Sequence, residues 1–237
     1  RGIQALVLTP TRELAEQVGK TLQKFAHYKK LDVREIYGGV SIGPQKMALR
    51  HADIVVGTPG RILDHLRNDS LNLSNIKFLV LDEADRMLDM GFIDDVVTII
   101  EQCPKERQTL LFSATISSDI QRIAKHYMKE PIVVESESYV DASKLKQVYY
   151  DTPSNLKFSM LVHLLKEEKS GLVMVFCNTR RNADYVVHNL QRNGLDAIAI
   201  HGGLAQNKRS RVLEEFHSAK ALILVCTGTY AHRLPKI

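Results

Sequence analysis

The segment Phe78-Leu79-Val80-Leu81-Asp82-Glu83-Ala84-Asp85 decides the fold, because an apolar run is followed at once by carboxylates. Such a run is typical of a buried strand, so the carboxylates are expected at the rim of a sheet. In open α/β sheets, ligands bind at the carboxyl ends of the strands. Carboxylate oxygens there suit Mg²⁺ that arrives with a nucleotide triphosphate. The alternative is an acidic first turn of a helix, which the helix dipole favours, and this segment alone does not decide between them.

Composition sets broad limits on the class of protein. A chain of 237 residues fits one large or two modest domains, and its net charge of +5 is compatible with a polyanionic partner. Cys103, Cys177 and Cys226 are far apart and form no CxxC pair, which indicates a reduced, cytoplasmic chain. The sequence shows neither an apolar run long enough to span a membrane nor a secretory signal, so no membrane partner is expected.

Apolar, β-branched runs alternate with stretches of helical periodicity along the chain. We expect strands at residues 5–8, 53–56, 78–81, 109–112, 172–176, 197–200 and 221–225. Between two of them, Leu14, Val18, Leu22 and Phe25 recur at close to helical spacing. This alternation predicts an α/β fold in which helices flank mainly parallel sheets.

The alternation stops in a polar stretch near residue 140. Residues 135–143 show neither the helical nor the strand period. We therefore expect a first domain at residues 1–136, a linker at 137–146 and a second domain at 147–237.

In the first domain, a polar signature follows each expected strand. Pro10-Thr11-Arg12-Glu13 follows the first, Thr58-Pro59-Gly60-Arg61 the second and Ser113-Ala114-Thr115 the last. Parallel strands would bring these signatures to one edge of the sheet. Free N–H groups at helix starts, with an adjacent arginine, form anion cradles, and several cradles on one rim suggest a strand of nucleic acid.

Each signature also has an ordinary structural explanation. Thr11 can simply cap a helix, and Pro59-Gly60 can simply form a turn. Ser113-Ala114-Thr115 can be a capped turn between a strand and a helix, and Gly38-Gly39 a turn rather than a place where a phosphate approaches the backbone. Gly19-Lys20-Thr21 looks like the end of a P-loop, but it lies inside a helical period without the required earlier glycine, so we expect plain helix.

Taken together, VLDEAD, PTRELA, Gly-Gly, TPGR and SAT, in this chain, resemble the motifs of the DEAD-box family of ATP-dependent RNA helicases. In the second domain, the segment from Val175 to Arg180 is similar to that family's fourth motif, and His201-Gly202 followed by Gln206 and Arg209 to the segment after it. The resemblance implies two RecA-like domains, ATP and Mg²⁺ as cofactors, and single-stranded or short duplex RNA as the partner of a monomeric protein.

The resemblance also implies a role for individual residues. Asp82 would hold Mg²⁺, and Glu83 would orient and activate the attacking water. Asp85 would hydrogen-bond to Ser113 and Thr115 and couple the nucleotide site to interdomain movement. The residues implied in gripping RNA phosphates are Thr11, Arg12, Gly39, Thr58, Gly60 and Arg61 in the first domain and Thr179, Arg180, Gly202 and Thr227 in the second.

The sequence departs from the family pattern at both ends. It opens at the strand before the third expected motif, without the adenine-recognition segment and the P-loop, and after Thr227 it lacks the expected aspartate and arginine motif. We therefore expect both domains to be incomplete and this chain to be inactive alone. The alternative function is a non-catalytic, sequence-indifferent RNA-binding fragment. A DNA-directed translocase is disfavoured by the Asp-Glu-Ala-Asp spelling.

Overall fold

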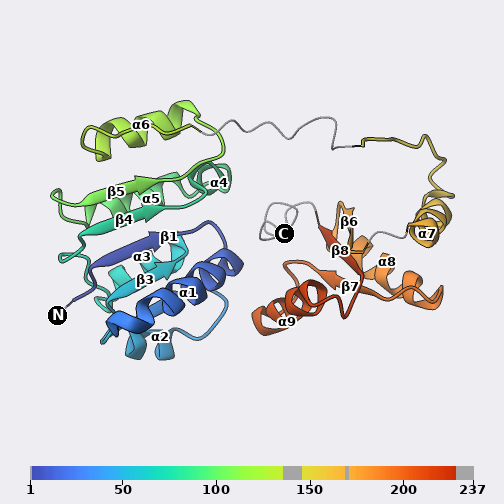
Figure 1. Ribbon diagram of the computed structural model, residues 1–237, viewed down its shortest axis with the longest axis horizontal. Coiled ribbons are helices and arrows are strands. Elements are labelled where there is room, and N and C mark those ends of the chain that lie inside the picture. The colour runs from blue at the N-terminus through green and yellow to red at the C-terminus, as the bar shows by residue number, and fades with distance from the viewer. Residues whose placement is uncertain (1, 136–145, 169–170, 228–237) are drawn as a thin grey trace. The chain divides into compact units, whose positions relative to one another are not determined.

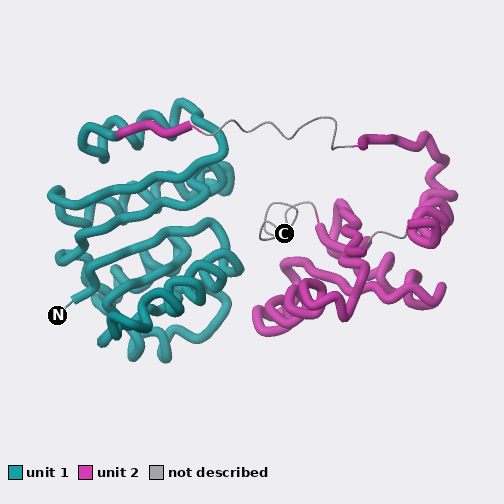
Figure 2. Tube along the Cα trace, in the orientation of Figure 1, with its two compact units in different colours: residues 1–131, 233–237 teal, residues 132–232 magenta. Residues whose placement is uncertain are grey.

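The computed structural model describes residues 2–135, 146–168 and 171–227, which divide into two compact units. Unit 1 comprises the described residues up to 131, and unit 2 the described residues from 132 to 227 (Figure 2). Apart from Lys146, the expected linker at 137–146 lies outside the described residues, so the proposed domain limits stay a prediction.

Unit 1 is built on a parallel sheet whose strands run in the order β2-β3-β1-β4-β5. The strands are β1 (Ala5–Leu8), β2 (Val33–Ile36), β3 (Ile54–Gly57), β4 (Phe78–Leu81) and β5 (Gln108–Leu111). On the central strand, Leu6 lies opposite Val55 on one side and Leu79 on the other. Because the strands are parallel, all their carboxyl ends meet at one edge of the sheet.

Helices cover both faces of this sheet (Figure 1). They are α1 (Arg12–Ala26), α2 (Ile42–Leu49), α3 (Pro59–Arg67), α4 (Ala84–Asp89), α5 (Ile93–Glu101) and α6 (Ser118–Tyr127), with a 3₁₀ turn, η1, at His27–Lys29. Side chains alternate between the faces of a strand. Leu6 and Leu8 accordingly pack in the cluster that contains α3 and α5, whereas Val7 packs with Ala15 of α1.

Unit 2 repeats this plan on a smaller scale within its described residues. Its parallel sheet has the order β6-β8-β7, and its helices are α7, α8 and α9. The bounds are β6 (Val173–Cys177), β7 (Ala197–Ile200), β8 (Ile223–Thr227), α7 (Lys157–Glu167), α8 (Arg180–Arg192) and α9 (Gln206–His217). Ala183 and Leu190 of α8 pack against Val225 of the middle strand to form its core.

The predicted fold class is confirmed, and each of the expected strands is present within two residues of its predicted position. Gly19-Lys20-Thr21 is helical, as expected, because it lies inside α1. The sequence analysis missed β2. Only Val33 and Ile36 of this strand are buried, and it pairs with β3 alone among the described strands. This short strand at the edge of the sheet therefore carries too few apolar residues to be recognised from the sequence.

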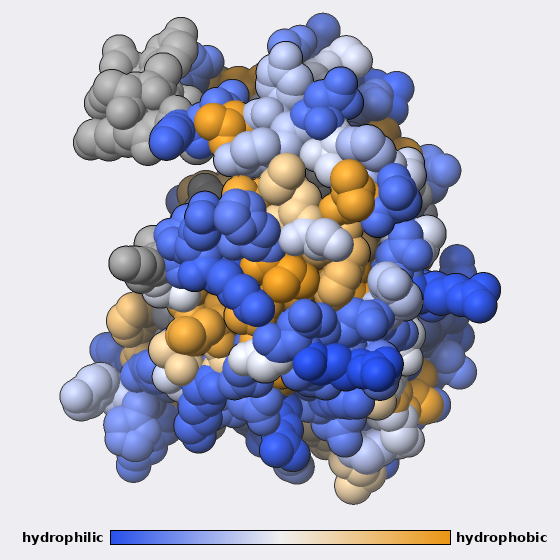
Figure 3. Space-filling view, turned by 90° about the vertical axis from the view of Figure 1, so that its right-hand side faces the viewer, coloured by the Kyte–Doolittle hydropathy of each residue, from blue (hydrophilic) through white to orange (hydrophobic). Residues whose placement is uncertain are grey.

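The surface mixes polar and apolar side chains. Figure 3 shows hydrophobic patches between hydrophilic residues on the face that it displays. The large apolar side chains exposed in unit 2 include Phe176, Tyr185 and Leu222. Among the described residues, no helix combines the length and the apolarity that crossing a membrane requires.

Candidate functional site

The carboxyl edge of the unit 1 sheet gathers all the polar signatures of the first domain. Gly38-Gly39 follows β2, Thr58 follows β3, Thr11 follows β1, Asp82 follows β4 and Ser113 follows β5. The strand order therefore sorts them into two groups. The glycine, threonine and arginine signatures follow the neighbouring strands β2, β3 and β1, and the carboxylates and Ser113 follow β4 and β5.

Asp85 joins the loops that follow β4 and β5. Its Oδ2 accepts hydrogen bonds from the Thr115 N–H and hydroxyl, both at 2.9 Å. Its own N–H donates to the Ser113 Oγ at 3.2 Å, and that hydroxyl donates to the Thr115 carbonyl at 2.7 Å. Burial raises the pKa of Asp85, but hydrogen bonds from Thr115 and from the Arg86 N–H outweigh it, so the net pKa is lowered. The carboxylate is thus held ionised as an acceptor.

Glu83 adopts a left-handed backbone conformation, with φ 47° and ψ 52°, directly before α4. This conformation is uncommon for a residue with a side chain. Its carboxylate pairs with Arg86 at 2.7 Å, and its N–H donates to the Asp82 Oδ1 at 3.0 Å. Asp82 stands at the edge of the sheet because β4 ends directly before it, and the turn at Glu83 leads the chain into α4.

The second group is centred on Arg12 and Gly39. Thr11 caps α1 by accepting a hydrogen bond from the Leu14 N–H at 3.3 Å. The next residue, Arg12, extends its guanidinium to the loop after β2, where a Cβ built on Gly39 would overlap it. Gly39 also has a positive φ of 79°, which favours glycine. The positive φ therefore favours glycine here, and a side chain at this position would also displace the end of Arg12.

Arg61 of α3 reaches the same loop. Its Nη1 and Nη2 each donate to the Val40 carbonyl at 3.1 Å, and Nη1 also donates to the Gln45 Oε1 at 2.9 Å. Thr58 and Gly60 of the same motif make no comparable contact among the described residues. Thr58 is buried before α3 and makes no side-chain cap hydrogen bond, and a Cβ on Gly60 would meet nothing within 4 Å.

Unit 2 contains a similar constellation on its own sheet. Thr179 caps α8 by accepting from the Asn182 N–H at 3.1 Å. Arg180 follows it, and its Nη2 lies 3.3 Å from a Cβ built on Gly202. Thr227 ends β8 and is buried. Each unit therefore places a threonine-capped helix and its first arginine beside a glycine.

Comparison with known proteins agrees with this geometry. The family model described as DEAD/DEAH box helicase matches residues 1–123, which is more than half of the chain. The chain belongs to this family. The model described as helicase conserved C-terminal domain matches residues 156–232. The family resemblance found in the sequence is confirmed.

Individual helicases of this family are similar over nearly the whole chain. A protein named as a probable ATP-dependent RNA helicase of Methanocaldococcus jannaschii is 44% identical over 95% of this chain and 60% of its own length. The DEAD-box ATP-dependent RNA helicase CshA of Geobacillus kaustophilus is 43% identical over 98% of this chain and 50% of its own. The chain thus spans about half of these relatives, taken by length.

Solved DEAD-box structures show the same fold. A crystal structure of a DEAD box protein from Methanococcus jannaschii has a TM-score of 0.57 at 44% identity, covering 96% of this chain and 61% of that one. The Saccharomyces cerevisiae protein Dbp5 bound to RNA and ADP BeF3 has a TM-score of 0.82 at 31% identity, covering 95% of this chain and 58% of that one. Both units are therefore RecA-like.

The carboxylates of this chain fit a magnesium ion. Mg²⁺ is usually held by one or two carboxylates together with water and substrate phosphates, rather than by a cage of protein ligands. The described part of the chain contains no group of three or more metal-ligating side chains, and Asp82 beside Glu83 supplies the smaller set of hard oxygens that Mg²⁺ needs. The donor chemistry suits Mg²⁺ and does not suit a zinc site.

The sequence analysis missed polar residues that support the site. In unit 1 these are Gln45, His65 and Arg86, and in unit 2 Asp184, which lies 2.9 Å from His201. The periodicity offered one clue. Gln45 is four residues from the buried Leu49, and His65 is three residues from the buried Ile62, so both polar residues fall on core-facing helix stripes.

The described structure also contains two hollows, of which one is lined by none of the site residues and supporting residues named above and the other, among these, only by Asp184. One, of about 600 Å³, lies at the amino ends of the unit 1 strands and is lined by Ile3, Asp32 and Asp53 among others. The other, of about 690 Å³, lies in unit 2 between α8 and α9 and includes Asp184. Ligands of open α/β sheets bind at the opposite, carboxyl edge, so we assign the chemistry to that edge.

Proposed function

We propose that this chain forms part of an ATP-dependent RNA helicase core, in which RNA-stimulated ATP hydrolysis is coupled to local unwinding of RNA duplexes. One observation carries the proposal. On a single sheet edge, the carboxylates after β4 and the hydroxyl side chains after β5 stand beside the glycines and arginines that follow β1, β2 and β3. The first group suits a metal–nucleotide complex, and the second suits a phosphate backbone.

In the nucleotide half, Asp82 would hold Mg²⁺ and Glu83 would orient and activate the attacking water. Bound Mg²⁺ would supply neutralisation of the charge that develops on the phosphates. The turn at Glu83 and its ion pair with Arg86 fix where this carboxylate stands. Glu83 then has to exchange this contact, at least in part, for the water that it orients.

Asp85, Ser113 and Thr115 would couple the nucleotide site to interdomain movement. Asp85 ties the end of β4 to the loop after β5 through the hydrogen bonds with Thr115. A shift of the carboxylates on nucleotide binding would move this loop, because the connection is short and fully hydrogen-bonded. That loop leads into α6 (Ser118–Tyr127).

In the RNA half, helix N-termini and arginine side chains would hold consecutive phosphates. Backbone N–H groups at the starts of α1, α3 and α8 are natural phosphate sites. The residues proposed for RNA contact are Thr11, Arg12, Gly39, Thr58, Gly60, Arg61, Thr179, Arg180, Gly202 and Thr227. Contacts of this kind bind without reading sequence and weaken with salt.

The relatives support this assignment. Curated relatives are named ATP-dependent RNA helicases, and the Dbp5 structure holds RNA together with ADP BeF3. ATP, Mg²⁺ and RNA are therefore the ligands we propose for this chain. A monomeric state and a cytoplasmic location belong to the same proposal.

ATP hydrolysis by the full-length protein, measured with and without single-stranded RNA, tests the nucleotide half. Glu83→Gln should lower the RNA-stimulated rate about 100-fold or more, because general acid–base groups contribute about 10²–10⁴-fold. Glu106→Gln, at an exposed position, is the matched control and should leave the rate unchanged. Equal rates in both variants would refute the role of Glu83. RNA binding without any stimulated hydrolysis would favour the non-catalytic RNA-binding alternative.

A further inference from the structure

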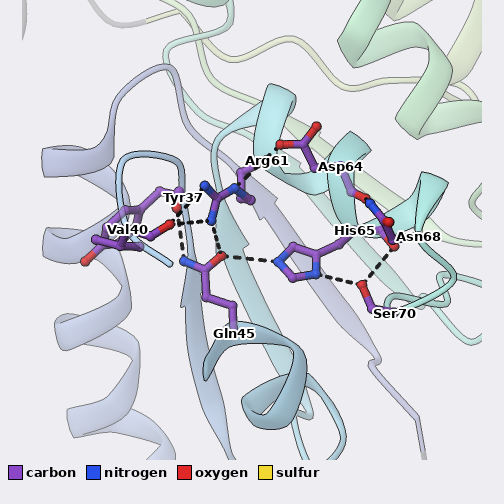
Figure 4. Close-up of polar contacts among 8 residues, drawn as sticks. All are labelled: Tyr37, Val40, Gln45, Arg61, Asp64, His65, Asn68 and Ser70. Carbon is purple, nitrogen blue, oxygen red and sulfur yellow. Dashed lines mark hydrogen bonds and ion pairs between the residues drawn. The ribbon is translucent and has the colours of Figure 1, made fainter. Parts of the chain in front are cut away.

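Arg61 is largely buried, although it is among the residues proposed to contact RNA phosphates. Only 13% of its side chain is exposed. Two of its nitrogens donate to the Val40 carbonyl, one also donates to Gln45, and its Nε lies 3.6 Å from the Asp64 carboxylate (Figure 4). Most of the guanidinium is therefore committed to this loop and to its own helix.

Gln45 of α2 is fixed in one orientation by three partners. Its Nε2 donates to the Tyr37 carbonyl at 3.0 Å, which turns its Oε1 to the other side. That oxygen accepts from Arg61 at 2.9 Å and lies 3.2 Å from the His65 Nε2. A flipped amide would present an N–H to Arg61 and an oxygen to the Tyr37 carbonyl, and both contacts would be repulsive.

His65 of α3 closes this network from the buried side. The ring is fully buried, and its Nδ1 lies 2.8 Å from the Ser70 Oγ. Because the Gln45 oxygen can only accept, the His65 Nε2 must carry the proton. In a neutral ring, Nδ1 then accepts from the Ser70 hydroxyl at 2.8 Å, and the His65 carbonyl is a second, longer acceptor for the same hydroxyl at 3.1 Å.

Electrostatics favours this neutral ring. Burial lowers the pKa of His65, and the nearby cations Arg61 and Lys46 lower it further, whereas Asp64 raises it. A neutral His65 keeps a second buried positive charge away from Arg61. The geometry and the charges therefore agree on one tautomer.

The far end of the network is the loop after β2. A Cβ built on Gly38 would lie 3.4 Å from the Arg12 Nη2 and 3.9 Å from the Arg61 Nη2, so two guanidinium groups flank this glycine. Arg61 fixes the loop through Val40, the residue after Gly39. The position of Gly39 beside Arg12 thus depends on Arg61.

We propose that Gln45 and His65 are positioning residues for RNA binding, acting through Arg61. Ser70 holds the His65 ring, His65 holds Gln45, and Gln45 holds the Arg61 guanidinium. Arg61 in turn holds the loop from Gly38 to Val40 beside Arg12. This inference rests on the proposed function only for the identity of the ligand. The coupling itself is a property of the protein without RNA.

A double-mutant cycle on this chain tests the proposal. The variants are Gln45→Leu, Arg61→Ala and their combination, with Met47→Leu, at an exposed position of the same helix, as the control. Two readouts are taken for each: amide hydrogen exchange at residues 38–41 without RNA, and binding of a mixed-sequence single-stranded RNA by fluorescence anisotropy.

Gln45→Leu should speed exchange in this loop and weaken RNA binding by about three- to tenfold, the usual net worth of one intramolecular hydrogen bond. In the Arg61→Ala background it should add less than about twofold, because residues acting through one another are not additive. Independent, multiplying effects, or unchanged exchange at residues 38–41, would overturn the proposal. If the parent chain binds no RNA, the proposed function fails, while the exchange data still judge the coupling.

A measurement on the unmutated chain covers the case in which Gln45→Leu does not fold. Nitrogen-15 NMR of the His65 ring should show a neutral imidazole with its proton on Nε2 at pH 7. Ser70→Ala should then speed exchange at residues 38–41 in the same direction, by less than Gln45→Leu would. A proton on Nδ1 alone would contradict the hydrogen-bond direction on which the network depends.

Discussion

The starts of α1 and α8 are nearly the same structure made twice. Thr11 has φ −133° and ψ 155°, and Thr179 has φ −134° and ψ 155°. Each caps its helix, and each is followed by an arginine that reaches a glycine in a loop after another strand, Gly39 in unit 1 and Gly202 in unit 2. Both sheets therefore place the N–H groups of a helix start and an arginine guanidinium close together.

The two sites differ in how tightly they are built. Thr11 is buried and Thr179 is exposed. Gly39 has a positive φ, and a Cβ there would overlap the Arg12 guanidinium, whereas Gly202 lacks a positive φ and a Cβ there would lie 3.3 Å from the Arg180 Nη2. Unit 1 supports its loop further through Arg61 and Gln45. The comparison indicates a rigid site in unit 1 and a more adaptable one in unit 2.

The glycines should separate the two sites most clearly. Gly39→Ala should destabilise unit 1 by about 2 kcal/mol, because the left-handed conformation alone costs a side chain about 1–2 kcal/mol and Arg12 must also move. Gly202→Ala should cost unit 2 less than about 0.5 kcal/mol, since Arg180 can shift. Residue-resolved hydrogen exchange measured at increasing urea concentrations gives the stability of each unit separately. Equal losses would mean that the two loops are equally tight.

The capping threonines should show a smaller difference in the same direction. Thr11→Ala should cost unit 1 about 1–1.5 kcal/mol and Thr179→Ala should cost unit 2 about 0.5–1 kcal/mol, within the range of measured caps. Thr11 is the more costly because its burial leaves the freed N–H of Leu14 with less access to water. Serine at either position is the control, because it keeps the capping oxygen. A larger loss at Thr179 would reverse the comparison.

RNA binding should test whether both arginines meet phosphates. Arg12→Gln and Arg180→Gln should each lower affinity by about three- to tenfold and reduce the salt slope by about 0.7, the value for one phosphate of a single strand. Arg67→Gln and Arg192→Gln, at exposed helix positions, are the controls. Affinity measured by anisotropy at several salt concentrations gives both quantities. An unchanged slope for Arg180→Gln would restrict the phosphate contact to unit 1.

The sequence predicted what depends on chain direction and local pattern. Strongly apolar strands such as β4 can be recognised from their sequence alone. Because polar residues that follow parallel strands lie at one edge of the sheet, Asp82 and Thr58 could be placed at that edge. The weakly apolar edge strand β2 could not be recognised. Nor could the partners of Arg61, because Gln45 and His65 meet it only after α2 and α3 pack on the sheet. Side-chain direction within a shared loop is decided by that packing.

Acid titration should reveal the nucleotide half of unit 1, with the smallest effect. The folded pKa of Asp85 lies below its usual value of 3.8, so the ionised carboxylate stabilises the fold above that pH. This contribution is lost as the pH falls through the lowered pKa, because protonation removes the negative charge that strengthens both Thr115 hydrogen bonds. Asp85→Asn should remove this part of the acid dependence of unit 1 stability and leave the stability of unit 2 unchanged. Hydrogen exchange measured from pH 5 downward reports both. Asp119→Asn, at an exposed ion pair with Arg122, is the control and should change little, since solvent screens such pairs. An acid dependence that survives Asp85→Asn would mean that another carboxylate holds the loops after β4 and β5 together.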